Sequence, residues 1–285
     1  MKKILAIISI TTSLYACTTK ATEQTHFTKN NNYVVILDLS DRIIQNADQV
    51  DIDTNAIRAV FERFEKSVQN NLVVKSGDKF SIRIIPQKSS SLPGNAFENN
   101  LSIDMAKFTG AEKLKNLHEF KNNFSKQLAL LYQNAYLGNK NSDFAGVDIW
   151  QYFNEQVNTD LDSKYNNRVV IITDGYFDFE DKQHGVSNYN RATTTAPLLK
   201  KMSVPNWQKL SSDNEIGLMP VKLQVEAQWL VCGIQPKTGN KDLLEAEKLG
   251  YIWKKWLKES GAKNINEPII NSSSLKMKNL ILKTL

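Results

Sequence analysis

The fold is decided by YVVILDLS at residues 33–40, an apolar run that ends in an aspartate, and RVVIITDG at residues 168–175 follows the same pattern. Continuous runs of this kind are typical of strands that are buried on both faces of a parallel sheet. Because parallel strands end at one edge of a sheet, Asp38 and Asp174 are expected to meet in one crevice. Two carboxylates beside the Ser40 hydroxyl are ligands that suit a hard divalent cation. The sequence therefore predicts an α/β fold with a metal-dependent binding site.

Two hydrophobic periods recur along the rest of the chain. Spacings of three and four residues indicate amphipathic helices, whereas alternating or continuous apolar runs indicate strands. In chain order we expect helix 51–69, strand 79–86, helix 111–136, a helix capped by Ser142, strand 225–234, helix 240–260, strand 265–270 and a terminal helix capped by residues 272–274. This alternation predicts a doubly wound, mainly parallel central sheet with helices on both faces.

The N-terminal residues have the pattern of an export signal. Residues 1–3 are basic, and the apolar run at 4–15 is too short to span a bilayer. The stretch LYAC at 14–17 resembles the lipobox of bacterial lipoproteins, in which the cysteine is acylated and becomes the mature N-terminus. This resemblance implies that Cys17 carries acyl chains, palmitate among them, and anchors the protein in the cell envelope, facing the periplasm or the exterior. The alternative is an ordinary secretory signal in which Cys17 is incidental.

Composition divides the chain into three parts. Residues 1–16 are predicted to form the signal peptide and are left out of the fold prediction. Residues 17–31 are polar and too poor in apolar side chains to offset their ordering entropy, so they predict a tether. Residues 32–285 fit one domain. Within it we expect insertions around 87–112, leaving the sheet, and around 176–222.

The chain is mildly basic, and its charge is spread along its length. Its 36 Lys and Arg outnumber its 30 Asp and Glu by six, and removal of Lys2 and Lys3 with the signal lowers the net charge to +4. There is no run of basic residues interleaved with aromatics, so no nucleic-acid partner is expected. Cys232 lies in an apolar run and is expected to be a buried core residue.

The order of elements and three motifs together resemble a von Willebrand factor A domain over residues 32–284. The motifs are DLSDR at 38–42, the loop and helix at Ser142, and TDG at 173–175. The resemblance implies a Rossmann-like, doubly wound sheet with a metal-ion-dependent adhesion site for Mg or Mn at the strand carboxyl ends. In that family the site combines Asp-x-Ser-x-Ser, a Thr and an Asp, and a carboxylate of the ligand often completes the metal shell. Carried over, the metal ligands would be Asp38, Ser40, Ser142 and Asp174.

Two positions depart from the family pattern. Arg42 stands where the second serine would be, so one oxygen ligand is missing and a cation is brought to the site. Either Asp41 compensates for that loss, or Arg42 points outward and contacts an acidic ligand. The threonine of the second loop also has no direct equivalent. Ser142 is the preferred match because it is expected to cap a helix, and Asp148 offers a second alignment.

Three functions from different classes follow from these residues. The first is a lipid-anchored module that binds an acidic side chain of a protein partner, through Mg or Mn. The second is a metal-free structural adaptor of the envelope, which would present an exposed apolar patch while Asp38 and Asp174 only cap loops. The third is a metal-dependent, phosphatase-like hydrolase. It would need an acid two residues after Asp38, where Ser40 stands, so we expect no enzyme.

Overall fold

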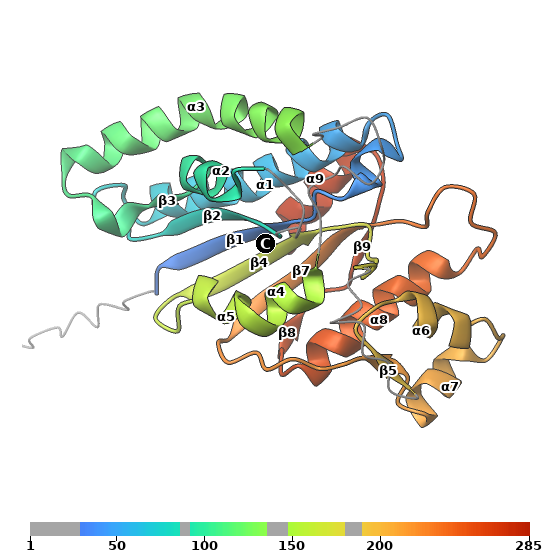
Figure 1. Cartoon of the computed structure of the whole chain (residues 1–285). Coiled ribbons are helices and arrows are strands. Elements are labelled where there is room, and N and C mark those ends of the chain that lie inside the picture. Colours follow the sequence, from blue (N-terminus) through green and yellow to red (C-terminus); the bar gives the residue numbers. More distant parts are fainter. Residues whose placement is uncertain (1–28, 86–91, 136–147, 180–189) are drawn as a thin grey trace, which may run out of the picture.

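The computed structural model describes residues 29–85, 92–135, 148–179 and 190–285, and it shows a mixed α/β fold with a mostly parallel central sheet (Figure 1). The strand order is β3-β2-β1-β4-β7-β8, and β9 also pairs with β7. Among the described strands, only β3 runs antiparallel to its neighbour. The strands are β1 (Asn31–Leu37), β2 (Lys79–Ile84), β3 (Ile103–Asp104), β4 (Asn166–Ile172), β7 (Ala227–Ile234), β8 (Asn264–Ile265) and β9 (Ile269–Ile270). A separate small sheet pairs β5 (Arg191–Ala192) with β6 (Gly217–Leu218).

The register of the central strands brings their carboxyl ends together. Leu37 of β1 lies opposite Ile172 of β4, so both strands end at the same level. The first residue beyond β1 extends this ladder, since the Asp38 amide donates to the Ile172 carbonyl at 3.0 Å. The residues that follow β1 and β4 therefore lie side by side at one edge of the sheet.

Helices cover both faces of the sheet (Figure 1). The α-helices are α1 (Gln49–Asn70), α2 (Gly94–Asn100), α3 (Ala111–Ala135), α4 (Ile149–Glu155), α5 (Val157–Asp160), α6 (Ala196–Lys201), α7 (Trp207–Asp213), α8 (Glu245–Glu259) and α9 (Ser274–Thr284). Two 3₁₀ turns, η1 (Asp41–Ile44) and η2 (Met105–Lys107), follow β1 and β3. Side chains of α1, α3 and α9 pack on one face, and those of α4 and α8 pack on the other.

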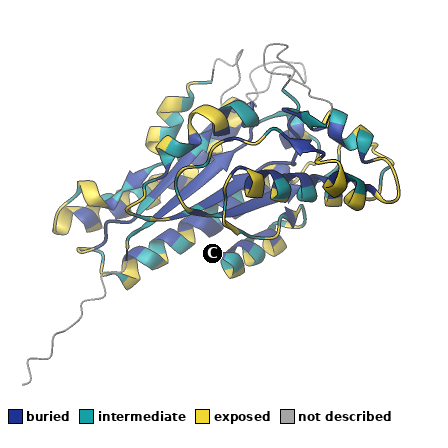
Figure 2. Cartoon of the chain, turned by 90° about the horizontal axis from the view of Figure 1, so that it is seen from below, coloured by how far each residue is buried: buried dark blue, intermediate teal, exposed yellow. Residues whose placement is uncertain are grey.

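Alternation along β1 divides the interior into two cores. Val35 and Leu37 point toward a core rich in phenylalanine, whereas Val34 and Ile36 point toward a core that contains most of the tryptophans. Figure 2 shows the strands as the buried layer, with helices that expose only their outer sides. All described elements lie within residues 29–285. Both hydrophobic cores are built from residues of this segment, so we expect it to fold on its own.

Most of the predicted elements are confirmed, and their limits need four corrections. Residues 103–104 pair with β2, so the 87–112 region returns to the sheet, where we had expected it to leave. The next helix that the structure describes, α4, begins at Ile149, while Ser142 lies outside the described residues. The expected strand 265–270 consists of the short strands β8 and β9. Asn31 belongs to β1 and not to a tether.

Within the described ranges, no helix is both long and apolar enough to cross a bilayer.

Candidate functional site

Asp38 and Asp174 meet at the carboxyl ends of the adjacent strands β1 and β4. Both are nearly inaccessible, with 1% and 4% of their surface exposed. Burial and the neighbouring charge of Asp38 raise the pKa of Asp174 to about 8. The predicted meeting of these two carboxylates in one place is confirmed.

Backbone and hydroxyl donors hold the two carboxylates in position. Asp38 Oδ1 accepts from the Ser40 amide at 2.9 Å, and its Oδ2 accepts from the Thr173 hydroxyl at 2.8 Å. Asp174 Oδ1 accepts from the Tyr176 amide at 3.1 Å. Among the described residues, no donor contacts Asp174 Oδ2, and the Ser40 hydroxyl makes no hydrogen bond. These two oxygens remain available to a ligand.

Arg42 lies inside the protein and does not point outward, so the expectation that it contacts an external acidic ligand is wrong. Its side chain is 0% exposed, and its Nη2 and Nη1 donate to the carboxylate of Asp53 on α1 at 2.6 and 3.3 Å. Its Nε donates to the Asp38 carbonyl at 3.0 Å and lies 3.8 Å from Asp38 Oδ2. The arginine therefore joins the loop after β1 to α1.

Asp53 completes a buried charge cluster that also includes Asp38, Asp174 and Arg42. Its carboxylate accepts from Gln49 Nε2 at 2.8 Å and from the Tyr132 hydroxyl at 3.0 Å. Burial and the Asp53 charge raise the pKa of Tyr132, so this phenol stays neutral. Three carboxylates thus face one guanidinium. When all three are ionised the cluster is two charges short of balance.

Asp53 and Thr173 are site residues that sequence reasoning missed. Asp53 lies four and seven residues before Ile57 and Val60, on the apolar face of the predicted helix. A carboxylate on such a face needs a partner, and that requirement was the available signal. Thr173 belongs to the TDG motif, and its role follows only once β1 and β4 are known to be neighbours.

Of the remaining predicted site residues, Asp41 and Asp148 lie outside the buried charge cluster. Asp41 is half-buried in η1, and its pKa is raised, chiefly by burial. Asp148 caps α4, with Oδ1 accepting from the Gln151 amide at 2.9 Å. The structure therefore gives Asp148 the helix-capping position that we expected of Ser142. Ser142 and Cys17 both lie outside the described residues.

An amide network connects the charge cluster to a surface groove of about 650 Å³. Asn271 Nδ2 donates to Gln49 Oε1 at 2.9 Å and to Gln235 Oε1 at 2.5 Å, and Gln49 in turn binds Asp53. The groove lies between the first turns of α1 and α9. Two exposed apolar side chains, Ile270 and Leu275, line it.

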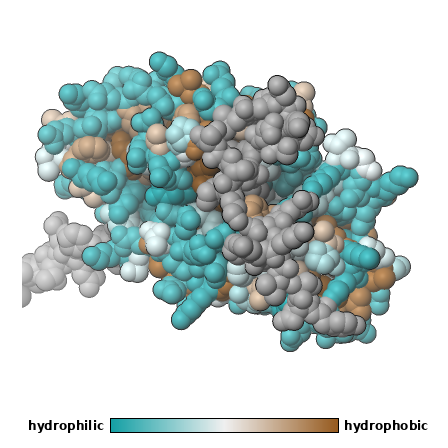
Figure 3. Space-filling view, in the orientation of Figure 1, coloured by the Kyte–Doolittle hydropathy of each residue, from teal (hydrophilic) through white to brown (hydrophobic). Residues whose placement is uncertain are grey.

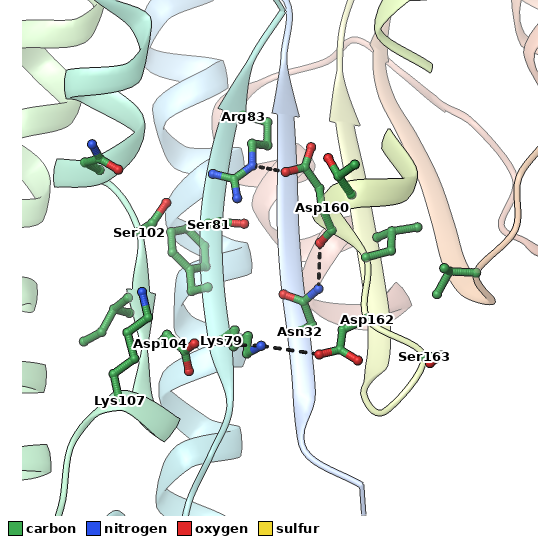
Figure 4. Close-up of a pocket in the computed structure, with 16 residues that line it drawn as sticks. Asn32, Lys79, Ser81, Arg83, Ser102, Asp104, Lys107, Asp160, Asp162 and Ser163 are labelled. Carbon is green, nitrogen blue, oxygen red and sulfur yellow. Dashed lines mark hydrogen bonds and ion pairs between the residues drawn. The ribbon is translucent and has the colours of Figure 1, made fainter. Parts of the chain in front are cut away.

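A second cavity, of about 580 Å³, lies on β2 near the opposite end of the sheet (Figure 4). Its charges face one another: Lys79 lies 3.6 Å from Asp162 and 3.8 Å from Asp104, and Arg83 binds Asp160. None of the predicted site residues lines this cavity. It is therefore separate from the carboxylate site.

In the parts of the chain that the structure describes, no group of three or more His, Cys, Asp or Glu side chains could hold a metal ion. Any ion at this site would therefore depend on two carboxylates and on hydroxyl oxygens or water.

No family model and no curated protein matches this chain. Among solved structures it is similar to the proximal thread matrix protein 1 of the mussel byssus, with 12% identity and a TM-score of 0.35. It is also similar to the pilus adhesin SpaC of Lactobacillus rhamnosus GG, with 10% identity and a TM-score of 0.43. The alignments cover 90% of this chain but only 47% and 30% of those chains, so it spans less than half of their length.

Proposed function

We propose that residues 32–285 form a von Willebrand factor A-like domain of the doubly wound, Rossmann-like type, carried by an envelope protein that Cys17 anchors through lipid. The domain binds a protein partner at the carboxyl edge of its sheet and carries out no catalysis. A divalent cation, Mg or Mn, held at Asp38, Ser40 and Asp174 mediates this contact.

The observation that carries the proposal is the buried pairing of Asp38 with Asp174. Two adjacent carboxylates out of water are costly unless a cation or a proton balances them. Arg42 supplies one positive charge, but it bonds mainly to Asp53. Asp174 has no ion pair with any described cation. A divalent ion would bring the charge of the whole cluster to zero.

The donor set fits such an ion. Carboxylate and hydroxyl oxygens are the ligands that Mg and Mn prefer, and Asp174 Oδ2 and Ser40 Oγ lack other partners among the described residues. Few protein charges would hold the ion, which leaves a coordination position for an Asp or Glu of the partner. Arg42 takes the place of one hydroxyl ligand of the family motif and lowers the affinity for a cation.

The test is thermal unfolding of residues 29–285 in Mg, Mn, Ca or chelator, compared with the Asp174→Asn variant. An ion that binds only the folded state raises stability by about 2.7 kcal/mol at one hundred times its dissociation constant. We expect this rise in the wild type and its loss in Asp174→Asn. Asp213→Asn is the control, because it removes an exposed carboxylate at the end of α7 and should keep the ion response. No rise in the wild type at millimolar ion would rule out the cation.

A metal-free adaptor is the second candidate, and one observation favours it. Apolar side chains are exposed at this end of the molecule, namely Ile44, Val50, Ile270 and Leu275, with exposed fractions from 38 to 69%. The face seen in Figure 3 is mainly hydrophilic where it is described, although single exposed apolar side chains such as Leu114 also occur away from this end. An adaptor would bind its partner equally with chelator and with Mg, and would lose it on Leu275→Asp.

A further inference from the structure

A pocket of about 370 Å³ lies at the opposite edge of the sheet, where β1 and β4 begin. Four basic residues line it: Lys29 before β1, Arg63 and Lys66 on α1, and Arg168 on β4. No aspartate or glutamate side chain lines it. The pocket therefore combines concave shape with charge of one sign, as a site for an anion does.

Three of these four cations, Lys29, Arg63 and Lys66, are not neutralised by the rest of the described protein. None of the four forms an ion pair with a described carboxylate side chain. Arg168 Nη1 donates to the main-chain oxygen of Leu285, the last residue of the sequence, at 2.5 Å and to Gln228 Oε1 at 3.2 Å, while its buried Nε has no described partner. Lys29 Nζ donates only to the Ser163 carbonyl, at 3.2 Å. Most of the positive charge is thus left for a ligand.

Among the described aspartate and glutamate side chains, Asp78 is the one bonded to the pocket wall, and its oxygens already accept hydrogen bonds. Asp78 is 0% exposed and does not line the pocket. Its oxygens accept from the Asn31 amide and the Ser67 hydroxyl, both at 2.7 Å. Asp78 therefore orders the wall without occupying the cations.

The cavity on β2 shows what a self-compensated site looks like in the same protein. There Lys79 lies between Asp104 and Asp162, and Arg83 binds Asp160 (Figure 4). The basic pocket has no aspartate or glutamate side chain in its lining that could pair with its cations in this way. Its unpaired charge therefore distinguishes the basic pocket from the cavity on β2.

We propose that this basic pocket binds the phosphate of an anionic phospholipid headgroup and seats the domain on the membrane. The inference rests on the lipid anchor in the proposed function, because an acylated Cys17 would bring the pocket close to the membrane surface. The described part of the chain begins at Lys29, in the pocket itself, and Lys29 follows Cys17 by only 12 positions. Twelve residues span at most about 40 Å. The tether therefore keeps the pocket close to the lipid headgroups, at a high effective concentration. In this orientation the carboxyl ends of β1 and β4 face away from the membrane.

The experiment measures binding of residues 29–285 to phosphatidylcholine vesicles with and without phosphatidylglycerol, by co-sedimentation at low and at physiological salt. We expect binding only to the phosphatidylglycerol vesicles, weakening with salt. In the double variant Arg63→Gln/Lys66→Gln it should weaken about 25-fold, about fivefold for each cation removed. Both side chains lie at the surface, so the variant should fold, and its thermal unfolding checks this.

The matched control is Lys209→Gln/Lys258→Gln, which removes the same charge from α7 and α8 at exposed positions. It should change binding by no more than about twofold. Equal loss in both double variants would show general charge attraction and overturn the proposal, as would equal binding to phosphatidylcholine alone. A thermal shift with inorganic phosphate that Arg63→Gln/Lys66→Gln abolishes, without vesicle binding, would assign the pocket to a soluble phosphate ligand and also overturn it.

A negative result for vesicle binding can be distinguished from failure of the proposed function. Asp174→Asn changes only the carboxylate edge and should bind vesicles as the wild type does. The anchor is tested separately on the full chain expressed in bacteria, as loss of metabolic palmitate labelling in Cys17→Ser.

Discussion

The two ends of the central sheet are built in opposite ways. At the carboxyl end, Asp38, Asp53 and Asp174 are buried around a single cation, Arg42, and their other hydrogen bonds come from neutral groups of the protein. At the amino end, basic side chains surround an open pocket and lack described carboxylate partners. One end thus has an excess of buried negative charge, and the other has an excess of accessible positive charge.

This difference separates structural charge from charge that is left for a ligand. A buried ion pair is held by desolvated, mutually dependent groups, so removing one partner is costly. An exposed unpaired cation contributes little to folding. Substitutions at the two ends should therefore differ in their effect on the free energy of unfolding, and four measurements rank that difference.

The largest effect is expected for Arg42→Ala. This change leaves Asp53 and Asp38 buried without their cation, which should lower the free energy of unfolding by about 3 to 5 kcal/mol. Urea unfolding of residues 29–285 measures it. The comparison fails if Arg42→Ala costs no more than a typical surface substitution, since the arginine would then contribute nothing to the fold.

The second effect is a pH dependence that Asp174 contributes. Burial and Asp38 raise its folded pKa to about 8, whereas an unfolded aspartate titrates near 3.9. The folded state therefore holds more protons, and the contribution to stability, complete at acidic pH, is lost as pH rises from about 4 to about 8. We expect a fall of about 2 kcal/mol between pH 5 and pH 7, at most about 1.4 kcal/mol per pH unit.

Asp174→Asn should remove this pH dependence, and a bound divalent ion should also remove it in the wild type. Urea unfolding across this pH range, with and without Mg, measures both. An equally steep fall in Asp174→Asn would assign the titration to another group.

The sequence predicted the meeting of Asp38 with Asp174 because each terminates an apolar strand and parallel strands share an edge. The sequence did not predict the orientation of Arg42. A residue that follows a strand can face inward or outward, and its direction depends on where its ionic partner lies in the fold. That partner, Asp53, lies on α1, and the pairing depends on how the helix packs. The pocket at Lys29 and Arg168 was likewise missed, because its residues come from three separate segments that are basic only when brought together.

The third effect tests how far the carboxyl-end cluster extends. Asn271→Ala removes the donor that bridges Gln49 and Gln235, leaving both amide oxygens without it. Loss of about 1 to 2 kcal/mol is expected, because these groups are partly buried. Thermal unfolding measures it, with Asn123→Ala on the exposed face of α3 as control. If Asn271→Ala and Asn123→Ala lowered the stability equally, the stabilising network would end at Gln49 and would not include Asn271.

The smallest effect is expected at the amino end. Lys66→Gln and Arg63→Gln each remove a cation that has no described ionic partner and that lies near others of its own sign. Their free energies of unfolding should stay within about 0.5 kcal/mol of the wild type. Reduced like-charge repulsion should shift any residual change toward greater stability, most clearly at low salt. Urea unfolding at two salt concentrations measures this. A loss comparable to that of Arg42→Ala would mean that these cations hold the fold together, and the contrast between the two ends would disappear.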